Sequence, residues 1–211
     1  LAPAAAEDAT NVPVHVKVVG LGKIAEVHVL ADYNPIVKAL VFYPGEAEPS
    51  LGFRLKVQQS TPIRAVVKTS EGKWYSGVHY IEAAGGGCTA PSFGTQAEWK
   101  ANLGKVQSRR FMPMSNGPEL SEGRTSDAAV RVRFRVSHPM DTGLAPGIPA
   151  LYIEELNLLD AKNNRVSRIE SFEPVSENPV YSLDLPKRYA SEALQLVGKD
   201  NQGNKVGAYL Q

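Results

Sequence analysis

Apolar and polar residues alternate in short stretches along most of this chain, and this period of two limits what the chain can fold into. In the clearest case, Val130–Val136, four apolar residues alternate with three arginines. Successive side chains of a β-strand point to opposite faces, so this pattern predicts a strand with one buried face. The predicted strands are residues 12–18, 24–31, 37–43, 53–57, 63–69, 74–80, 130–136, 150–160, 165–172, 181–185, 194–198 and 206–210. About six short strands in each half, separated by turn residues, predict an all-β chain of two β-sandwiches.

Length, charge and cysteine content narrow the class of protein. The 211 residues allow one large or two small domains, and a net charge of +1 argues against a nucleic-acid binder. No apolar run approaches the roughly 18 residues of a membrane-spanning helix. The single cysteine excludes an intramolecular disulfide framework and a multi-cysteine zinc site. The start, Leu-Ala-Pro-Ala-Ala-Ala, fits a chain trimmed after a signal peptide, or a sequence that begins at a chosen boundary.

That cysteine, Cys88, follows three consecutive glycines, Gly85, Gly86 and Gly87, and residues 83–91 contain no bulky side chain. A structural free cysteine is normally surrounded by large apolar residues. Glycine loses more backbone entropy on ordering than any other residue, which favours mobility here. The segment therefore predicts a solvent-reachable thiol on a flexible arm, and the alternative is a thiol with no function.

The predicted organisation is a first domain at residues 1–88, a linker at 89–127 and a second domain at 128–211. The first eleven residues are small and polar, so we expect a frayed end. Pro, Gly and Ser are frequent at 111–126, which is typical of a linker. His138-Pro139-Met140-Asp141-Thr142-Gly143 is expected to form a structural loop, with the interface between the two sandwiches as an additional place for it.

One short helix is expected inside the linker. Thr95 and Glu98 have the spacing of a capping box, in which each side chain bonds the backbone of the other residue. Trp99, Leu103 and Val106 follow at the spacing of one helix face. Neither half of the chain contains a long helical pattern.

Particular motifs of the chain resemble SoxZ in the second half and SoxY in the first. The SoxZ-like motifs are Val130–Val136, the segment His138-Pro139-Met140-Asp141-Thr142-Gly143, Ile148-Pro149-Ala150 and Val175-Ser176-Glu177-Asn178-Pro179. The SoxY-like motifs are Val12-Pro13-Val14, Asn34-Pro35 and Gly86-Gly87-Cys88. The resemblance covers nearly the whole chain except residues 89–127. It implies two immunoglobulin-like sandwiches that pair within one chain, as a fused SoxYZ-like protein of the type associated with quinoprotein (PQQ) dehydrogenases.

The resemblance also implies a function, which is the periplasmic carriage of sulfur during thiosulfate oxidation. Cys88 would hold a sulfur or related small adduct covalently, and Gly85, Gly86 and Gly87 would form the carrier arm. The SoxY motif is a Gly-Gly-Cys-Gly-Gly tail that ends its chain, whereas here Thr89 and Ala90 follow Cys88 and the chain continues. An arm tethered at both ends searches less volume than a free tail.

The expected partners are periplasmic redox enzymes, either Sox-type enzymes or a quinoprotein dehydrogenase, with no nucleic acid and no membrane. No set of acid, base and nucleophile is visible, so a carrier without its own active site or cofactor is expected. The alternative is a non-catalytic adaptor for a periplasmic quinoprotein dehydrogenase. Arg131, Arg133 and Arg135 share one strand face, which is either a solvated face or a docking patch for an acidic partner. The four histidines show no metal-ligand spacing, so no metal site is expected.

Overall fold

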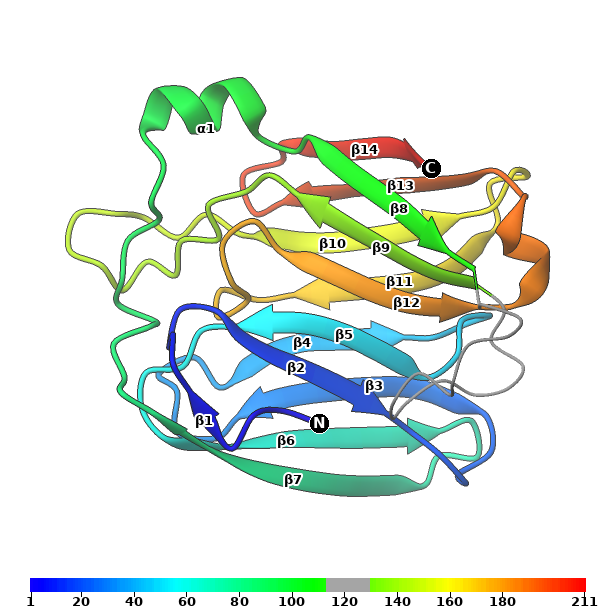
Figure 1. The fold of residues 1–211 in the computed structure, drawn as a ribbon, viewed down its shortest axis with the longest axis horizontal. Coiled ribbons are helices and arrows are strands. Elements are labelled where there is room, and N and C mark those ends of the chain that lie inside the picture. Colours follow the sequence, from blue (N-terminus) through cyan, green and yellow to red (C-terminus); the bar gives the residue numbers. More distant parts are fainter. Residues whose placement is uncertain (113–129) are drawn as a thin grey trace.

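The computed structural model describes residues 1–112 and 130–211, whose strands form a nine-stranded sheet and a five-stranded sheet packed face to face (Figure 1). The larger sheet contains, in spatial order, β1 (Ala5–Ala6), β7 (Trp74–Ala83), β6 (Thr61–Thr69), β3 (Ile24–Ala31), β4 (Lys38–Tyr43), β11 (Arg165–Ser171), β10 (Ile153–Leu159), β13 (Leu194–Asp200) and β14 (Lys205–Leu210). The smaller sheet contains β2 (Val12–Lys17), β5 (Ser50–Leu55), β12 (Val180–Leu185), β9 (Val130–Val136) and β8 (Val106–Phe111). All the strands predicted from the alternating pattern are present, and the all-β sandwich class is confirmed.

Both sheets run through both halves of the chain. In the larger sheet β4 pairs antiparallel with β11, with Phe42 opposite Ile169. In the smaller sheet β5 pairs antiparallel with β12, with Leu51 opposite Leu183. The two halves therefore pair within the chain through one backbone ladder in each layer, rather than as two closed sandwiches in contact.

The hydrophobic core between the sheets is shared by the two halves. Phe42 and Leu51 from the first half belong to the same buried cluster as Phe134 and Tyr181 from the second. Burying a side chain of this size contributes roughly 1.5–3 kcal/mol. The buried Tyr181 hydroxyl lies 2.8 Å from the Ser171 hydroxyl, so its polar atom is also satisfied.

A strand inside the predicted linker was missed. β8 pairs antiparallel with β9, with Val106 opposite Val136. Its sequence does not alternate clearly because Arg110 takes an inward position. There its guanidinium donates hydrogen bonds of 2.7–2.9 Å to the carbonyl oxygens of Tyr189, Glu192 and Leu210. Of the linker predicted at 111–126, only residues 111 and 112 lie within the described part of the chain.

The prediction of a frayed start is also wrong. β1 runs parallel to β7, with Ala5 opposite Glu82. The Val57 N–H donates to the Ala9 carbonyl oxygen at 2.8 Å, and the Ser176 hydroxyl donates to the Thr10 carbonyl oxygen at 2.8 Å. Small polar residues gave no apolar pattern, but their backbone groups pair regardless of side chain.

The predicted short helix is present as α1 (Gln96–Asn102), and its capping box is confirmed. The Glu98 N–H donates to the Thr95 hydroxyl at 3.3 Å, and the Glu98 carboxylate accepts from the Thr95 N–H at 2.8 Å. The helix ends before Gly104, whose φ of +74° is a left-handed conformation that glycine adopts without strain. Val106, expected on the helix face, therefore belongs to β8. No described helix, either α1 or the 3₁₀ turn Lys187–Ala190, is long and apolar enough to cross a membrane.

Candidate functional site at the domain junction

The glycine run that follows β7 is packed tightly against other backbone segments. The Gly86 N–H donates to the Gln58 carbonyl oxygen at 2.9 Å, and the Gly87 N–H donates to the Val57 carbonyl oxygen at 3.0 Å. A Cβ placed on Gly87 would lie 2.1 Å from the Ala9 carbonyl oxygen, too close for any side chain. A Cβ on Gly85 would lie 2.7 Å from the Gln58 carbonyl oxygen, so Gly85 and Gly87 are needed for close approach, whereas a Cβ on Gly86 would meet nothing within 4 Å. The prediction that Gly85, Gly86 and Gly87 form a flexible arm is wrong for this conformation.

The Cys88 thiol is buried, which contradicts the expected solvent-reachable thiol. Cys88 is only 1% exposed, and its S–H donates to the Lys56 carbonyl oxygen at 3.7 Å. Burial raises the pKa of the thiol to about 11, and the nearby Lys56 charge offsets only part of this shift. At pH 7 roughly one molecule in ten thousand holds the nucleophilic thiolate. Local sequence could not reveal this burial, because the residues that cover Cys88 come from distant segments.

The second half of the chain holds the Cys88 segment in place. The Thr142 hydroxyl donates to the Cys88 carbonyl oxygen at 2.5 Å. The Asp141 carboxylate accepts from the Ser92 N–H at 3.1 Å and from the Ser92 hydroxyl at 3.2 Å. These contacts fix the chain on the far side of Cys88, where the sequence predicted a linker. One residue further on, a carboxylate oxygen of Glu177 accepts from the Phe93 N–H at 2.8 Å.

A buried lysine lies beside the thiol. Lys56 is 3% exposed, and its ammonium donates to the Met140 carbonyl oxygen at 2.6 Å. The Asn34 amide donates to the Lys56 carbonyl oxygen at 2.8 Å, the same oxygen that accepts from Cys88. Burial lowers the pKa of Lys56, and the negative charges of Asp141 and of nearby groups partly oppose that effect. Sequence reasoning missed Lys56. The available signal was a lysine between Leu55 and Val57, in the middle of an apolar run.

The loop at residues 138–143 was expected to be structural, with the interface as an additional place for it, and it lines this junction. The Met140 N–H donates to Nδ1 of His138 at 3.1 Å, and Nε2 of His138 lies 3.4 Å from an Asp200 carboxylate oxygen. Met140 has a φ of 51°, a left-handed conformation rare outside glycine, so its neighbours must hold it there. Burial lowers the pKa of His138, while Asp200 acts in the opposite direction. This loop places Thr142 and Asp141 against the Cys88 segment.

The three arginines lie on the outer face of the smaller sheet, but their surroundings differ. The Arg131 guanidinium makes a two-point contact with the Asp184 carboxylate at 2.7 and 2.8 Å. Asp184 also accepts from the Ser50 hydroxyl at 3.3 Å, so Arg131 belongs to a network that joins the two halves. Arg133 and Arg135 are exposed.

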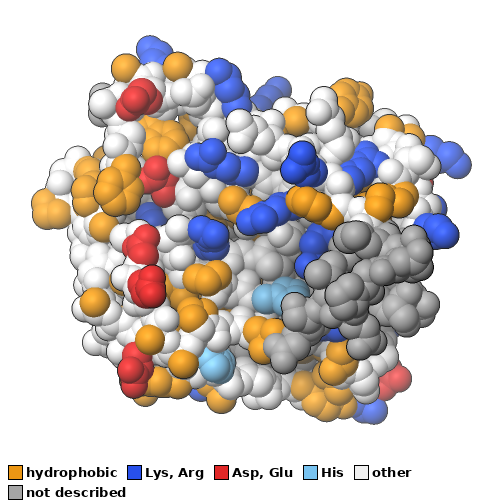
Figure 2. Space-filling view, viewed as in Figure 1, with side chains coloured by type: hydrophobic (Ala, Val, Ile, Leu, Met, Phe, Trp, Pro, Cys, Tyr) orange, Lys and Arg blue, Asp and Glu red, His pale blue; other side chains and the backbone are white. Residues whose placement is uncertain are grey.

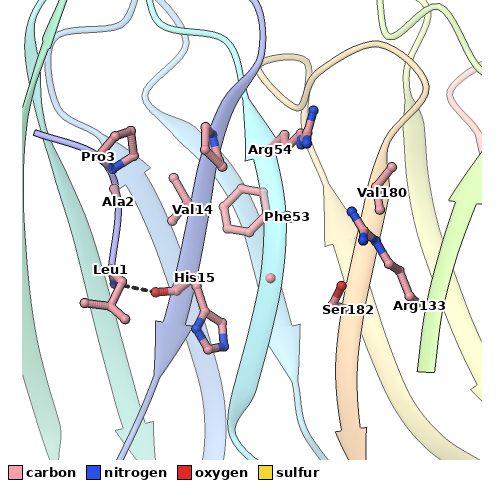
Figure 3. A pocket seen from close by; sticks show the side chains of 12 residues that line it. Leu1, Ala2, Pro3, Val14, His15, Phe53, Arg54, Arg133, Val180 and Ser182 are labelled. Atoms are coloured by element: carbon pink, nitrogen blue, oxygen red, sulfur yellow. Dashed lines mark hydrogen bonds between the residues drawn. The ribbon is translucent and has the colours of Figure 1, made fainter. Parts of the chain in front are cut away.

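The same face carries more positive charge than the sequence pattern indicated. Arg109 of β8 lies opposite Arg133 of β9, and both are exposed. Arg133, Arg54 and His15 help to line a hollow of about 450 Å³ (Figure 3). Figure 2 shows Lys and Arg side chains gathered over the upper part of this face, with acidic side chains mainly at its left margin. We call this surface, which carries Arg54, Arg109, Arg131, Arg133 and Arg135, the cationic face.

Comparison with known families assigns both halves. The family model for sulfur oxidation protein SoxY matches residues 1–88, and the model for sulphur oxidation protein SoxZ matches residues 120–210. The chain belongs to the SoxY and SoxZ families. It is a fused SoxYZ-like protein, in which a SoxY domain precedes a SoxZ domain. No curated protein matches the chain.

These families have a role as sulfur carriers in sulfur oxidation, and SoxYZ proteins are carriers rather than catalysts. Cys88 is the last residue of the SoxY match, and Thr142, Asp141 and Glu177 lie in the SoxZ domain. The site around the thiol is therefore built by both domains. Among residues 1–112 and 130–211, no three His, Cys, Asp or Glu side chains are grouped so that they could hold a metal ion.

Proposed function

We propose that this fused SoxYZ-like protein carries a sulfur intermediate covalently on Cys88 for partner enzymes of the periplasm. The observation that supports the proposal is the position of Cys88, a free thiol at the last residue of the SoxY match. It is the single cysteine of the chain, so any adduct carried on a thiol must form there. The Gly86-Gly87-Cys88 resemblance to the SoxY carrier motif points to the same atom.

Loading is proposed to proceed by thiol–disulfide exchange. The Cys88 thiolate attacks one sulfur of a disulfide-linked donor, and a new S–S bond forms as the donor bond breaks. The second donor sulfur leaves as a thiolate, and the proton of the Cys88 thiol passes to solvent. No net oxidation occurs in this step. Later oxidation of the carried sulfur would be the task of partner redox enzymes.

Carriage requires the Cys88 segment to leave the position that it has in this structure. A partner active site cannot reach a thiol that is 1% exposed. The bonds to be broken include those of Cys88 with Thr142 and of Ser92 with Asp141. Each such bond contributes about 0.5–1.5 kcal/mol net, so an opening driven by partner binding is energetically accessible. Gly85 and Gly86 are proposed as the hinge about which the segment rotates, because glycine changes backbone conformation easily and both have positive φ, 97° and 81°.

The burial of Cys88 also favours a second candidate function, in which the thiol is structural. The protein would then be a non-catalytic adaptor for a periplasmic quinoprotein dehydrogenase. Its docking patch would be the cationic face, where Arg133 and Arg135 are exposed and Arg131 is held by Asp184. A carrier could use the same patch, because steering by opposite charge speeds the encounter with an acidic partner.

Intact mass spectrometry of protein from its native compartment distinguishes the two functions. A carrier will show mass additions equal to sulfur-containing groups, which a reductant removes and Cys88→Ser abolishes. Arg133→Glu tests docking separately, because it changes the cationic face and leaves Cys88 intact. If this face docks the partner, a smaller fraction of the variant than of the wild type should carry the mass addition. An unmodified thiol during active sulfur oxidation would contradict the carrier function and leave the adaptor.

A further inference from the structure

One edge of the larger sheet is open. β7 lies at that edge, and β1 pairs with it only at Glu82 and Ala83. Among the described residues, positions 74–81 have backbone partners only in β6. Figure 1 shows β7 as the outermost strand along the lower side of the molecule. We call residues 74–81 the β7 edge.

The β7 edge is apolar and lacks the features that normally protect an exposed strand. Trp74, Val78 and Tyr80 on its outer face are 53%, 61% and 52% exposed, and Tyr75 on the other face is 42% exposed. The sequence Trp-Tyr-Ser-Gly-Val-His-Tyr-Ile contains no Asp, Glu, Lys, Arg or Pro. Pairing with β6 is regular and has no bulge. Free edges are usually blunted by charges, proline or bulges, so an uncovered edge of this composition indicates a pairing site.

The direction of the free backbone groups follows from their neighbours. The Glu82 N–H donates to the Ala4 carbonyl oxygen at 2.9 Å, toward the open side, and the Ala83 N–H donates to the Ser60 hydroxyl at 3.0 Å, toward β6. Backbone groups alternate in direction along a strand. The residues whose N–H and C=O groups point outward on the β7 edge are therefore Trp74, Ser76, Val78 and Tyr80.

We propose that the β7 edge is a dimerisation site, at which two copies of this chain pair β7 against β7 antiparallel. The two-fold axis passes beside Gly77. Trp74 then lies opposite Tyr80 of the second copy, and Ser76 lies opposite Val78 of the second copy. All four outward-facing residues of each strand exchange backbone hydrogen bonds in this register. The two larger sheets become one continuous sheet.

The sequence around Gly77 is self-complementary in this register. On the outer face, the indole of Trp74 meets the ring of Tyr80. On the inner face, the ring of Tyr75 meets the imidazole of His79. Facing aromatic pairs stabilise antiparallel strands, and each pair occurs twice about a two-fold axis. The absence of charged side chains also means that two identical edges do not repel each other. A second copy therefore fits this edge better than an unrelated charged strand.

Gly77 and β1 fix the centre and the length of the pairing. A glycine inside a strand weakens the strand unless another backbone must approach it closely. A Cβ on Gly77 would meet nothing within 4 Å in the single chain, so packing within the chain does not explain the glycine. On the axis, Gly77 would face Gly77 of the second copy. Ala5 occupies the edge opposite Glu82, so a register shifted toward Glu82 would lose pairs.

Sedimentation velocity over a concentration series tests the dimer, with a reductant present so that no Cys88 disulfide contributes. We expect a reversible monomer–dimer equilibrium in the whole chain. Val78→Lys and Ser76→Glu should each weaken the dimer at least tenfold while leaving the circular dichroism spectrum unchanged. An equimolar mixture of the two variants should dimerise again, because positions 76 and 78 of opposite copies then carry opposite charges. Tyr209→Lys, an exposed site on β14 at the other edge, is the matched control and should have no effect.

Amide exchange gives a readout independent of the variants. In the dimer, the amides of Trp74, Ser76, Val78 and Tyr80 should become protected as concentration rises, whereas the amides between them are protected by β6 at every concentration. A wild-type chain that stays monomeric up to millimolar concentration overturns the proposal. So does a dimer that survives both Val78→Lys and Ser76→Glu, or one without this alternation of protection.

Discussion

The hydroxyl of Thr142 donates a hydrogen bond of 2.5 Å to the carbonyl oxygen of Cys88, and this contact ties the SoxZ domain to the last residue of the SoxY match. Both residues are buried. Any reagent that reaches the thiol from outside must therefore disturb the junction between the domains. Access to Cys88 and the contact between the two domains are coupled, and the coupling can be measured.

Replacing Thr142 should speed access to the thiol. Thr142→Val removes the donor to the Cys88 carbonyl oxygen and keeps the shape of the side chain. We expect a loss of about 1 kcal/mol in the free energy of unfolding and labelling of Cys88 by a maleimide that is roughly fivefold faster. Thr142→Ser retains the hydroxyl and should behave like the wild type. Equal labelling rates for all three proteins would show that this bond does not restrain the segment.

The thiol of the native wild-type protein should react slowly. Because Cys88 is 1% exposed and its pKa is about 11, maleimide labelling at pH 7 should be at least a hundredfold slower than in denaturant. If the rate is limited by local opening, low urea concentrations should increase it before global unfolding begins. Similar rates in native and denatured protein would contradict the buried thiol and support the exposed arm that the sequence predicted.

Stability should fall in alkaline solution because of Cys88. The pKa of the thiol rises from 9.0 to about 11 on folding, so between these values the folded state holds a proton that the unfolded state has lost. The stabilisation by this group is complete below pH 9 and is lost as pH rises toward 11. A shift of two units corresponds to about 3 kcal/mol.

Urea unfolding of the wild type and of Cys88→Ser at several pH values isolates this effect, because Lys56 is present in both proteins. The difference in free energy of unfolding between them should be constant from pH 6 to 8. Above pH 9 the wild type should lose stability relative to Cys88→Ser, by up to about 3 kcal/mol at pH 11. A difference that stays constant through pH 11 would mean that the folded protein accommodates the thiolate.

The alternating pattern predicted the strands well because strand faces are a local property. Val130–Val136 needed only its own sequence to be recognised, and it forms β9 with Arg133 and Arg135 outside. β8 was missed because its inward residue Arg110 is satisfied by carbonyl oxygens far away in the chain. Such a partner cannot be read from local periodicity.

The site was predictable only in part, for the same reason. Sequence reasoning selected Cys88 and predicted a structural loop at 138–143, with the interface between the sandwiches only as an additional place for it. It interpreted three glycines as mobile, whereas Gly87 is required because the Ala9 backbone passes within contact distance. Glycine permits both mobility and close packing, and the sequence of the segment does not distinguish the two. Lys56 became visible only when the fold brought it beside the thiol.

Glycine substitution separates these two roles. Gly87→Ala should destabilise the protein by about 2–4 kcal/mol, because its Cβ would overlap the carbonyl oxygens of Ala9 at 2.1 Å and Val57 at 2.7 Å. Gly77→Ala is the matched control, since its Cβ would meet nothing within 4 Å. It should be neutral or slightly stabilising at low protein concentration. Chemical unfolding measures both, and a Gly87→Ala protein as stable as the wild type would contradict the packed segment.

The shared sheets should make the two domains unfold together. Ile169 of β11 lies opposite Phe42 of β4 across the domain boundary, and both are buried. Ile169→Ala should therefore lower the free energy of unfolding by about 2–5 kcal/mol. The loss should be seen equally by a probe in the SoxY domain and a probe beside the SoxZ domain, because a single core and both sheets cross the boundary. Trp74 reports on β7, and Trp99 reports on α1 next to the SoxZ domain. Single-tryptophan variants, made with Trp99→Phe or Trp74→Phe, should give coincident urea transitions before and after Ile169→Ala. Two separate transitions, with only one shifted by Ile169→Ala, would show that the strand pairs β4–β11 and β5–β12 do not couple the domains.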